Sequence, residues 1–523
     1  MAVIAMIALS TIFFTALKIL QYRALFSWEN GDDAVYNQCA YSTARGGLFQ
    51  STVKGDRIMF DHLHPIIAVY GGAYLAHPHI YTWFLLNSFL LSAGAVPIFR
   101  LARGWLGSSG MALAAAGFYL FYSPLHAMQL GVLEPEKLAI PFWLFAAQAY
   151  YRKRPAAFAA WSAAALCCKE NMGLILCMFG VYALLQGRRA GWILIPFAAG
   201  LVWLAVALGW VVPKLMPEVT YQYEYLRQIQ GGGGGFSGIF DMVLLHPWEA
   251  LRLAVRTDHL LLLWRLARPT ALLCLLAPEV LLLSAPTLAQ ILLTQPRLTT
   301  PQDHWLSGAV PFFILATVIG WSRLGRVAAV GRRRARWAAP IMLLACAIWS
   351  AAGDNLIGEL HDDHIDDTRF IGVTNIFDPA FLRWDNTDRA AWEIMAFIPD
   401  SASVAANGPL LVPLSNRLLL YEFGHPRHEG RELTADYIML QVSPAYFGGG
   451  HDVFLDTANL LPLKTRLEAG MYDVKAFRDG FLLLRSRPAP ASDGPPAALL
   501  RTLDRVMAQS ALLAPLRGSR ETF

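Results

Sequence analysis

The sequence predicts an α-helical membrane protein with many spans, followed by a smaller α/β domain. Of the 523 residues, 55% are hydrophobic and 15% are charged, whereas soluble domains carry roughly 25% charged residues. Lys and Arg outnumber Asp and Glu by 27 to 15 in residues 1–353, and the balance reverses to 16 against 23 in residues 354–523. The basic, apolar part is therefore expected in the membrane and the acidic, more polar part in water.

About eleven apolar segments are expected to form spans, because a helix needs about 20 mostly apolar residues to cross a bilayer. They are residues 2–21, 79–102, 110–131, 135–151, 156–171, 173–187, 191–213, 258–276, 278–295, 304–323 and 337–353.

The orientation of these spans follows from short clusters of Lys and Arg at residues 100–103, 152–154, 188–189 and 323–336. Basic loop residues stay in the cytoplasm. The N-terminus is therefore expected in the cytoplasm, and the C-terminal domain outside the inner (plasma) membrane. Because the clusters lie between apolar runs and set topology, nucleic acid is not expected as a partner.

In this topology the longer polar segments lie outside the membrane. The first outer loop, residues 22–78, is expected to carry the catalytic residues. Its clearest feature is Asp32-Asp33, directly after Gly31. Where lipid headgroups meet water, one carboxylate could act as a general base on an acceptor hydroxyl, or both could bind a divalent cation, Mg²⁺ or Mn²⁺. The alternative is that Asp32 or Asp33 caps a helix over residues 34–44.

Four more ionisable residues occur at the predicted outer ends of spans: Glu136, Lys169, Glu170 and His304. Charges at membrane depth are costly and usually face a cavity or a partner. These residues are therefore candidates for substrate binding. The alternative is that they form plain turns between helices.

Cationic side chains elsewhere complete the set of candidates. His62 lies between Asp61 and His64, a spacing compatible with binding a metal or a phosphate, or with a helix cap formed by Asp61. Arg265 and Arg268 interrupt an apolar stretch. They are expected either to face a carboxylate or a lipid phosphate, or to snorkel to one headgroup layer.

Residues 354–486 are expected to form the extracytoplasmic α/β domain. An amphipathic helix is predicted over 388–398, and short strands over 403–406, 417–421 and 437–441. Residues 472–477 and 481–485 are predicted to form a hairpin about Asp479-Gly480. Residues 487–523, rich in Pro, Ala and Ser at first, are expected to be a weakly ordered tail.

Several short motifs resemble the prokaryotic polytopic membrane proteins grouped as domain of unknown function family 2079. They are Asp61-His62 with Pro65-Ile66, the run 135–141, Cys168-Lys169-Glu170, the run 276–279, His304 and the run 398–404. Members of this family look like membrane glycosyltransferases of the C fold class (GT-C). The resemblance implies a polyprenyl-phosphate-linked sugar as the donor and a catalytic carboxylate in the first outer loop, here Asp32 or Asp33.

The leading hypothesis is a membrane glycosyltransferase acting at the outer face of the inner membrane, on an unknown glycan, lipid or protein acceptor. A transporter or flippase of a lipid-linked sugar is the first alternative, because charges at broken helices also suit alternating access. A non-catalytic envelope assembly protein is the second alternative.

Overall fold

The structure is a computed structural model that divides the chain into two compact units. It describes residues 1–25, 31–55, 57–58, 62–215, 242–293, 304–325, 341–343, 345–346, 384, 386–428, 430–442, 455, 457–490 and 494–518. Unit 1 comprises Met1–Leu17, Asp61–Ile66 and Phe84–Glu359, and unit 2 comprises Lys18–Phe60, Ile67–Trp83 and Leu360–Phe523. Each unit is described by itself below.

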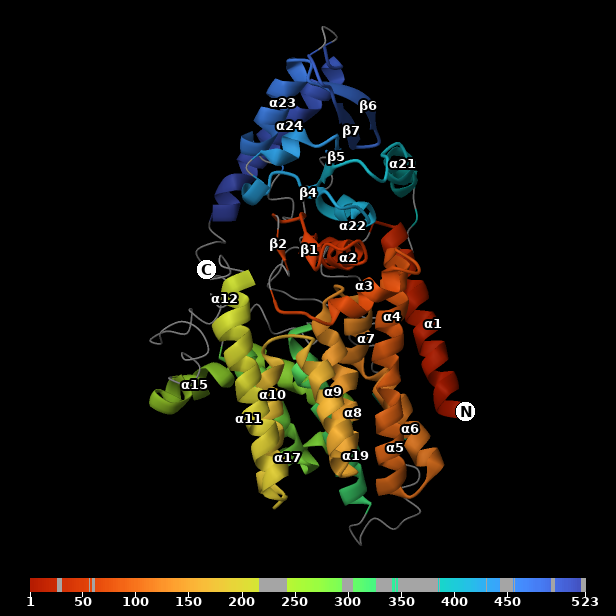
Figure 1. The fold of residues 1–523 in the computed structure, drawn as a ribbon, viewed down its shortest axis with the longest axis vertical. Coiled ribbons are helices and arrows are strands. Elements are labelled where there is room, and N and C mark those ends of the chain that lie inside the picture. Colours follow the sequence, from red (N-terminus) through yellow and green to blue (C-terminus); the bar gives the residue numbers. More distant parts are fainter. Residues whose placement is uncertain are drawn as a thin grey trace. The chain divides into compact units, whose positions relative to one another are not determined.

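Unit 1 is helical throughout its described part, and its helices α8 to α11 and α19 run side by side (Figure 1). Its first helices are α1 (Ala2–Arg23, which continues into unit 2), α4 (Ile80–Ala93, which begins in unit 2), α5 (Ala95–Leu106), α6 (Ser109–Phe121) and α7 (Ser123–Leu130). After the 3-10 helix η2 (Pro135–Leu138) come α8 (Ala139–Tyr151), α9 (Pro155–Leu166), α10 (Met172–Leu185) and α11 (Ala190–Val206), which continues through the π-helix η3 (Ala207–Val211) into α12 (Val212–Leu215). The remainder consists of α15 (Pro247–Ala254), α16 (Thr257–Ala267), η5 (Arg268–Thr270), η6 (Leu273–Leu276), α17 (Pro278–Leu281), η7 (Leu282–Ser284), α18 (Ala285–Leu292), η9 (His304–Gly308) and α19 (Val310–Leu324).

Small residues let α10 and α11 pack closely. A Cβ atom added to Gly200 would lie 2.4 Å from the carbonyl oxygen of Gly173, and one added to Gly180 would lie 2.6 Å from the carbonyl oxygen of Ile193. Close approach of backbones at small residues is the usual basis of helix association in lipid, where apolar side chains gain little by leaving the solvent. From α11, the Trp203 indole N–H also donates to the Glu170 carbonyl oxygen at 3.0 Å, in the turn between α9 and α10 that carries two of the candidate residues.

The described helices confirm a mostly helical protein, while the count of eleven spans stays a prediction. Three of them are long and apolar enough to cross a bilayer by themselves: Ala2–Arg23, Ile80–Leu106 and Ala190–Leu215. Shorter apolar helices cover several other predicted spans. The predicted span 258–276 is not one helix, because α16 ends at Ala267 and two successive residues, Ala271 and Leu272, adopt positive φ. Most of the predicted span 337–353 lies outside the described residues.

Unit 2 contains a five-stranded mixed sheet with the order β4-β3-β5-β7-β6. Its strands are β3 (Val404–Ala406), β4 (Leu420–Glu422), β5 (Tyr437–Gln441), β6 (Tyr472–Arg478) and β7 (Phe481–Ser486). Strand β3 runs parallel to both neighbours, whereas β5, β7 and β6 pair antiparallel. Asp479 and Gly480 both adopt positive φ in the hairpin turn, as the pair predicts. All five strands lie within a few residues of their predicted positions.

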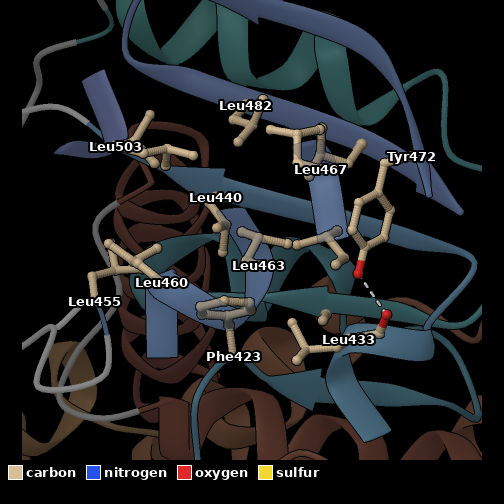
Figure 2. Packing of buried hydrophobic residues seen from close by; sticks show 14 of the residues in the cluster. Phe423, Leu433, Leu440, Leu455, Leu460, Leu463, Leu467, Tyr472, Leu482 and Leu503 are labelled. Atoms are coloured by element: carbon tan, nitrogen blue, oxygen red, sulfur yellow. Dashed lines mark hydrogen bonds between the residues drawn. The ribbon is translucent and has the colours of Figure 1, made fainter. Parts of the chain in front are cut away.

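Helices cover the sheet. They are α21 (Asn386–Met395), α22 (Leu411–Leu414), α23 (Thr457–Glu468) and α24 (Ala497–Gly518), with the 3-10 turns η11 (Gly408–Leu410), η12 (Pro426–His428) and η13 (Arg431–Thr434). Figure 2 shows the core that α23 and α24 build on one sheet face, where Leu463 and Leu503 pack with Leu440 and Leu482. The Tyr472 hydroxyl closes this core by donating to the Leu433 carbonyl oxygen at 2.6 Å.

Within the predicted weakly ordered tail, 487–523, the described residues 497–518 instead form a helix. Helix α24 places Leu499, Leu503 and Val506 fully inside the unit 2 core. Their spacing of three and four residues forms the apolar stripe of a packed helix. The sequence shows this stripe, but the Pro- and Ala-rich residues before it suggested that the whole segment is weakly ordered.

The first polar segment also folds with unit 2. It supplies α2 (Asp32–Thr43), the two-stranded hairpin of β1 (Gln50–Ser51) and β2 (Arg57–Ile58), and α3 (Ile67–Tyr74). Beside strand β4, the Val53 carbonyl oxygen accepts from the backbone N–H of Glu422 at 2.9 Å. The expected boundary after residue 353 is close to the division at Glu359, but residues 18–60 join the C-terminal unit.

Candidate functional site

The two candidate carboxylates of the first loop open helix α2 in unit 2. Gly31 is the N-cap residue, with φ +75°, so neither aspartate caps the helix. Asp32 and Asp33 stand in the first turn, where the positive end of the helix dipole favours negative charge. Lys54 donates its ammonium to Asp32 Oδ1 at 2.5 Å, and the Asp32 side chain remains 27% exposed.

Asp33 has a different environment from its neighbour. It is only 4% exposed, and it interacts electrostatically with Lys18, a buried residue of α1. A solute can therefore reach the carboxylate of Asp32 more easily than that of Asp33. The structure thus separates two residues that the sequence leaves equivalent.

Polar contacts fix the position of α2 within unit 2. Asn37 donates to the Ser415 hydroxyl at 2.7 Å and accepts from the Tyr74 hydroxyl at 2.5 Å. Gln38 donates to the Arg417 carbonyl oxygen at 3.0 Å and accepts from the Thr52 backbone N–H at 2.8 Å. Because these amides are buried and bonded on both sides, Asp32 is carried by a rigid element.

A buried cluster of charged and imidazole side chains occupies unit 1. Lys169, in the turn between α9 and α10, donates to Glu136 Oε2 of the 3-10 helix η2 at 2.5 Å. The two side chains are 2% and 1% exposed. Two candidates that lie 33 residues apart in the sequence therefore form one ion pair.

His62 and Glu170 form a second buried pair in the same unit. The His62 Nδ1 lies 2.7 Å from Glu170 Oε1, and the backbone N–H of Leu63 donates to Glu170 Oε2 at 2.9 Å. The Glu170 carboxylate accepts both bonds, so the His62 Nδ1 carries a proton and donates.

His64 belongs to this cluster as a neutral ring. Burial lowers the pKa of His64 to about 3, and His62 adds to the lowering. Its Nδ1 lies 2.5 Å from the Cys168 carbonyl oxygen, which can only accept, so Nδ1 carries the proton. Its Nε2 lies 4.0 Å from Glu134 Oε2, which is also buried. Neither His64 nor Glu134 was among the candidate residues, although His64 completes the predicted spacing around His62.

An aromatic ring covers the ammonium group of Lys169. The Lys169 Nζ lies 4.3 Å from the ring centroid of Trp305, and the His62 ring is 6.3 Å from the same indole. Trp305 was not among the candidates, but its neighbour His304 was. His304 begins η9, and its side chain lies outside the described part of the chain.

We define the buried network as His62, His64, Glu134, Glu136, Lys169, Glu170 and Trp305.

The contacts described for the buried network do not include Arg265 or Arg268. Arg265 lies in the last turn of α16, and Arg268 begins the 3-10 turn that ends this helix. Both are half-buried. They therefore lie where the predicted span breaks, and their expected role toward a phosphate stays a prediction.

The residues present do not favour a divalent cation at Asp32 and Asp33. In the described parts of the chain, no group of three His, Cys, Asp or Glu side chains could hold a metal ion. Asp32 is ion-paired with Lys54, and Asp33 interacts with Lys18. A cation would compete with two ammonium groups there, so we derive no chemistry through a metal.

The apolar helical unit with buried ion pairs, together with the polar α/β unit, defines a helical membrane protein with an appended sheet domain. The chain belongs to the family described as predicted membrane protein, DUF2079, whose model matches residues 30–483. No curated protein sequence matches it. Among solved structures, it is similar to ArnT from Cupriavidus metallidurans bound to undecaprenyl phosphate, with 13% identity, a TM-score of 0.49, and coverage of 93% of this chain and 99% of that one.

Proposed function

We propose that this chain is a membrane glycosyltransferase that moves a sugar from a polyprenyl-phosphate donor to an acceptor at the outer face of the inner membrane. The observation that supports this most is the pairing of Lys169 with Glu136, and of His62 with Glu170, inside an apolar helical unit. Ionisable groups buried at membrane depth are costly to keep and mark substrate sites by default. The motif resemblance to family 2079, whose members look like C-class glycosyltransferases, supports the same reaction.

The reaction needs a base for the acceptor, and unit 2 supplies one in Asp32. An acceptor hydroxyl oxygen attacks the anomeric carbon of the donor sugar, and its proton passes to the Asp32 carboxylate. We assign this role to Asp32 rather than Asp33 because Asp33 is buried and interacts with Lys18. Lys54 occupies Oδ1 of Asp32, so Oδ2 is the atom assigned to accept the proton.

The reaction also needs a cation for the leaving group, and unit 1 supplies one in Lys169. The bond between the anomeric carbon and the phosphate oxygen breaks, and polyprenyl phosphate departs with the electron pair. Lys169 would stabilise the developing phosphate charge by exchanging part of its interaction with Glu136 for the phosphate oxygens. The Trp305 ring over the ammonium group offers an apolar surface to a sugar or a prenyl unit.

Transfer from undecaprenyl phosphate carrying a labelled hexose, in membranes that contain the chain, tests this proposal. Asp32→Asn should reduce incorporation of the label into the acceptor at least about a hundredfold, the usual scale for loss of a general base. Asp479→Asn is the matched control, because it makes the same chemical change in an exposed turn of unit 2 that tolerates Asn. Full activity of a correctly inserted Asp32→Asn protein contradicts the proposed base.

One observation favours the transporter alternative, namely the broken helical segment from α16 to α18. Its helices are short and are separated by turns, including the left-handed pair Ala271 and Leu272. Discontinuous helices build the substrate sites of many secondary transporters. Proteoliposomes that move the labelled lipid-linked hexose across the bilayer, without forming a new glycosidic bond, would favour transport over transfer.

A further inference from the structure

A separate polar pocket lies in unit 1, where the C-terminal ends of several helices meet. Its volume is about 100 Å³, which is below the usual range for pockets that hold drug-sized ligands. Its polar and aromatic lining comes from the ends of α5, α8, α10 and α19, and from α17. The lining residues that matter here are Trp105, Tyr151, Tyr182, Gln186, Glu279 and Arg323. None of them belongs to the buried network.

The only acidic group in this lining is already occupied by an arginine. Arg323 Nη1 donates to Glu279 Oε2 at 3.2 Å, and its Nη2 donates to Oε1. Nη1 also donates to the Leu276 carbonyl oxygen at 2.6 Å. A guanidinium has five N–H groups, and in the described contacts Nε and one hydrogen of Nη2 have no acceptor. Because the Arg323 side chain is 41% exposed, a ligand can reach these donors.

The tyrosine pair adds another donor to the pocket. The hydroxyls of Tyr151 and Tyr182 lie 2.5 Å apart, and the Gln186 amide donates to the Tyr182 oxygen at 2.7 Å. Two hydroxyls carry two hydrogens, and their mutual bond uses only one. Among the described residues the second hydrogen has no acceptor. The pocket therefore presents unpaired donors while its carboxylate is already paired, which suits a ligand with several oxygen acceptors.

The charge at this end of the helices points to an anion. Arg103, Arg152, Lys153, Arg154, Arg188 and Arg189 all follow or end the helices that line the pocket. Part of this charge complements the negative ends of the helix dipoles. Basic pockets between membrane helices are also the usual binding sites for anionic lipid headgroups.

We propose that this pocket binds the phosphodiester headgroup of an anionic phospholipid. The phosphate oxygens accept from Arg323 and from the hydroxyl hydrogen of the Tyr151–Tyr182 pair, and the rings of Trp105 and Tyr151 flank the glycerol. This binding does not depend on glycosyl transfer. It makes the pocket a lipid site of unit 1 rather than part of the proposed reaction.

Native mass spectrometry of the purified full chain, released from detergent, tests the proposal with phosphatidylglycerol and phosphatidylcholine as probes. We expect one tightly held phosphatidylglycerol and at least about tenfold weaker phosphatidylcholine, which corresponds to about 1.4 kcal/mol. Arg323→Gln and Tyr182→Phe should each weaken phosphatidylglycerol binding about tenfold, the scale of one hydrogen bond to a charged group. Arg252→Gln, an exposed charge on α15 that is not part of the lining, is the matched control and should change binding less than about twofold.

Three outcomes would overturn this proposal. The first is equal binding of the two lipids. Both carry an anionic phosphate, so equal binding would show that the pocket does not select for a net negative headgroup. The second is an effect of Tyr182→Phe no larger than that of Arg252→Gln, since the tyrosine variant removes one hydroxyl and keeps the Glu279–Arg323 pair. The third is full displacement of the lipid by millimolar inorganic phosphate, which would assign the pocket to free phosphate.

Discussion

The buried ion pair of Lys169 and Glu136 allows a test that separates folding from function. Replacing either residue alone with Met removes the partner that neutralises the other charge, at 2% and 1% exposure. Breaking a buried ion pair in this way costs about 3–5 kcal/mol. At roughly 2–4 °C for each kcal/mol, the unfolding midpoint of Lys169→Met or Glu136→Met should fall by about 6–20 °C.

The double variant Lys169→Met/Glu136→Met should behave differently. Removing both charges together leaves no uncompensated charge, and replacement of a buried pair by apolar residues of similar volume is often neutral or stabilising. We therefore expect the midpoint of the double variant to recover at least half of the loss, while glycosyl transfer stays abolished. Lys475→Met, at an exposed position of β6, is the matched control and should leave both quantities unchanged.

Thermal unfolding of the detergent-purified protein, followed by size-exclusion chromatography, measures the midpoints, and transfer of labelled hexose in membranes measures activity. A double variant that is both stable and fully active would refute the assigned role of Lys169. Single variants as stable as the wild type would refute the buried pair itself.

Further predictions concern pH and packing. Because the folded-state pKa of His64 is about 3 and the unfolded value is about 6.5, folding stability should fall as pH drops from 6.5 toward 3, by about 2 kcal/mol at pH 5. Unfolding midpoints at pH 7 and pH 5 measure this, and His64→Gln should remove the contribution of about 2 kcal/mol while the exposed His77→Gln should keep it. Gly31→Ala should destabilise unit 2 by at least about 1 kcal/mol, seen as faster limited proteolysis, because φ is +75° there. Leu463→Ala should cost about 2–5 kcal/mol in the unit 2 core, against less than about 0.5 kcal/mol for the exposed Leu461→Ala; equal midpoints for the two variants would contradict the packing in Figure 2.

The sequence predicts local structure well where local physics decides it. Period-two apolar patterns and the Asp479-Gly480 turn locate the strands of the sheet, and the apolar runs locate most of the helices. The break between α16 and η6 was not predicted, because most of the stretch 258–276 is apolar, although Pro269 lies at the break. Helix α23 was also missed, since Pro462 lies within it.

The candidate site was predicted only as a set of residue types. The pairings of Lys169 with Glu136 and of His62 with Glu170 depend on contacts between turns that are far apart in the chain. No local pattern predicts such partners. The same reason explains why Lys54 was missed as the partner of Asp32, because a lysine 22 residues away in a polar loop carries no signal of its own.

The union of the first polar segment with the C-terminal unit sets an order of assembly. Gln38 and Thr52 bond to residues around 417–420, more than 360 positions later in the chain. Helix α2 therefore cannot reach its final position until the chain has been synthesised past residue 420. Residues 354–523 produced alone would lack α2, and would leave the backbone edge of β4 that pairs with Val53 open to other chains. The carboxylate that we assign as the base is thus among the last parts of the protein to mature, so an incompletely made chain would be inactive.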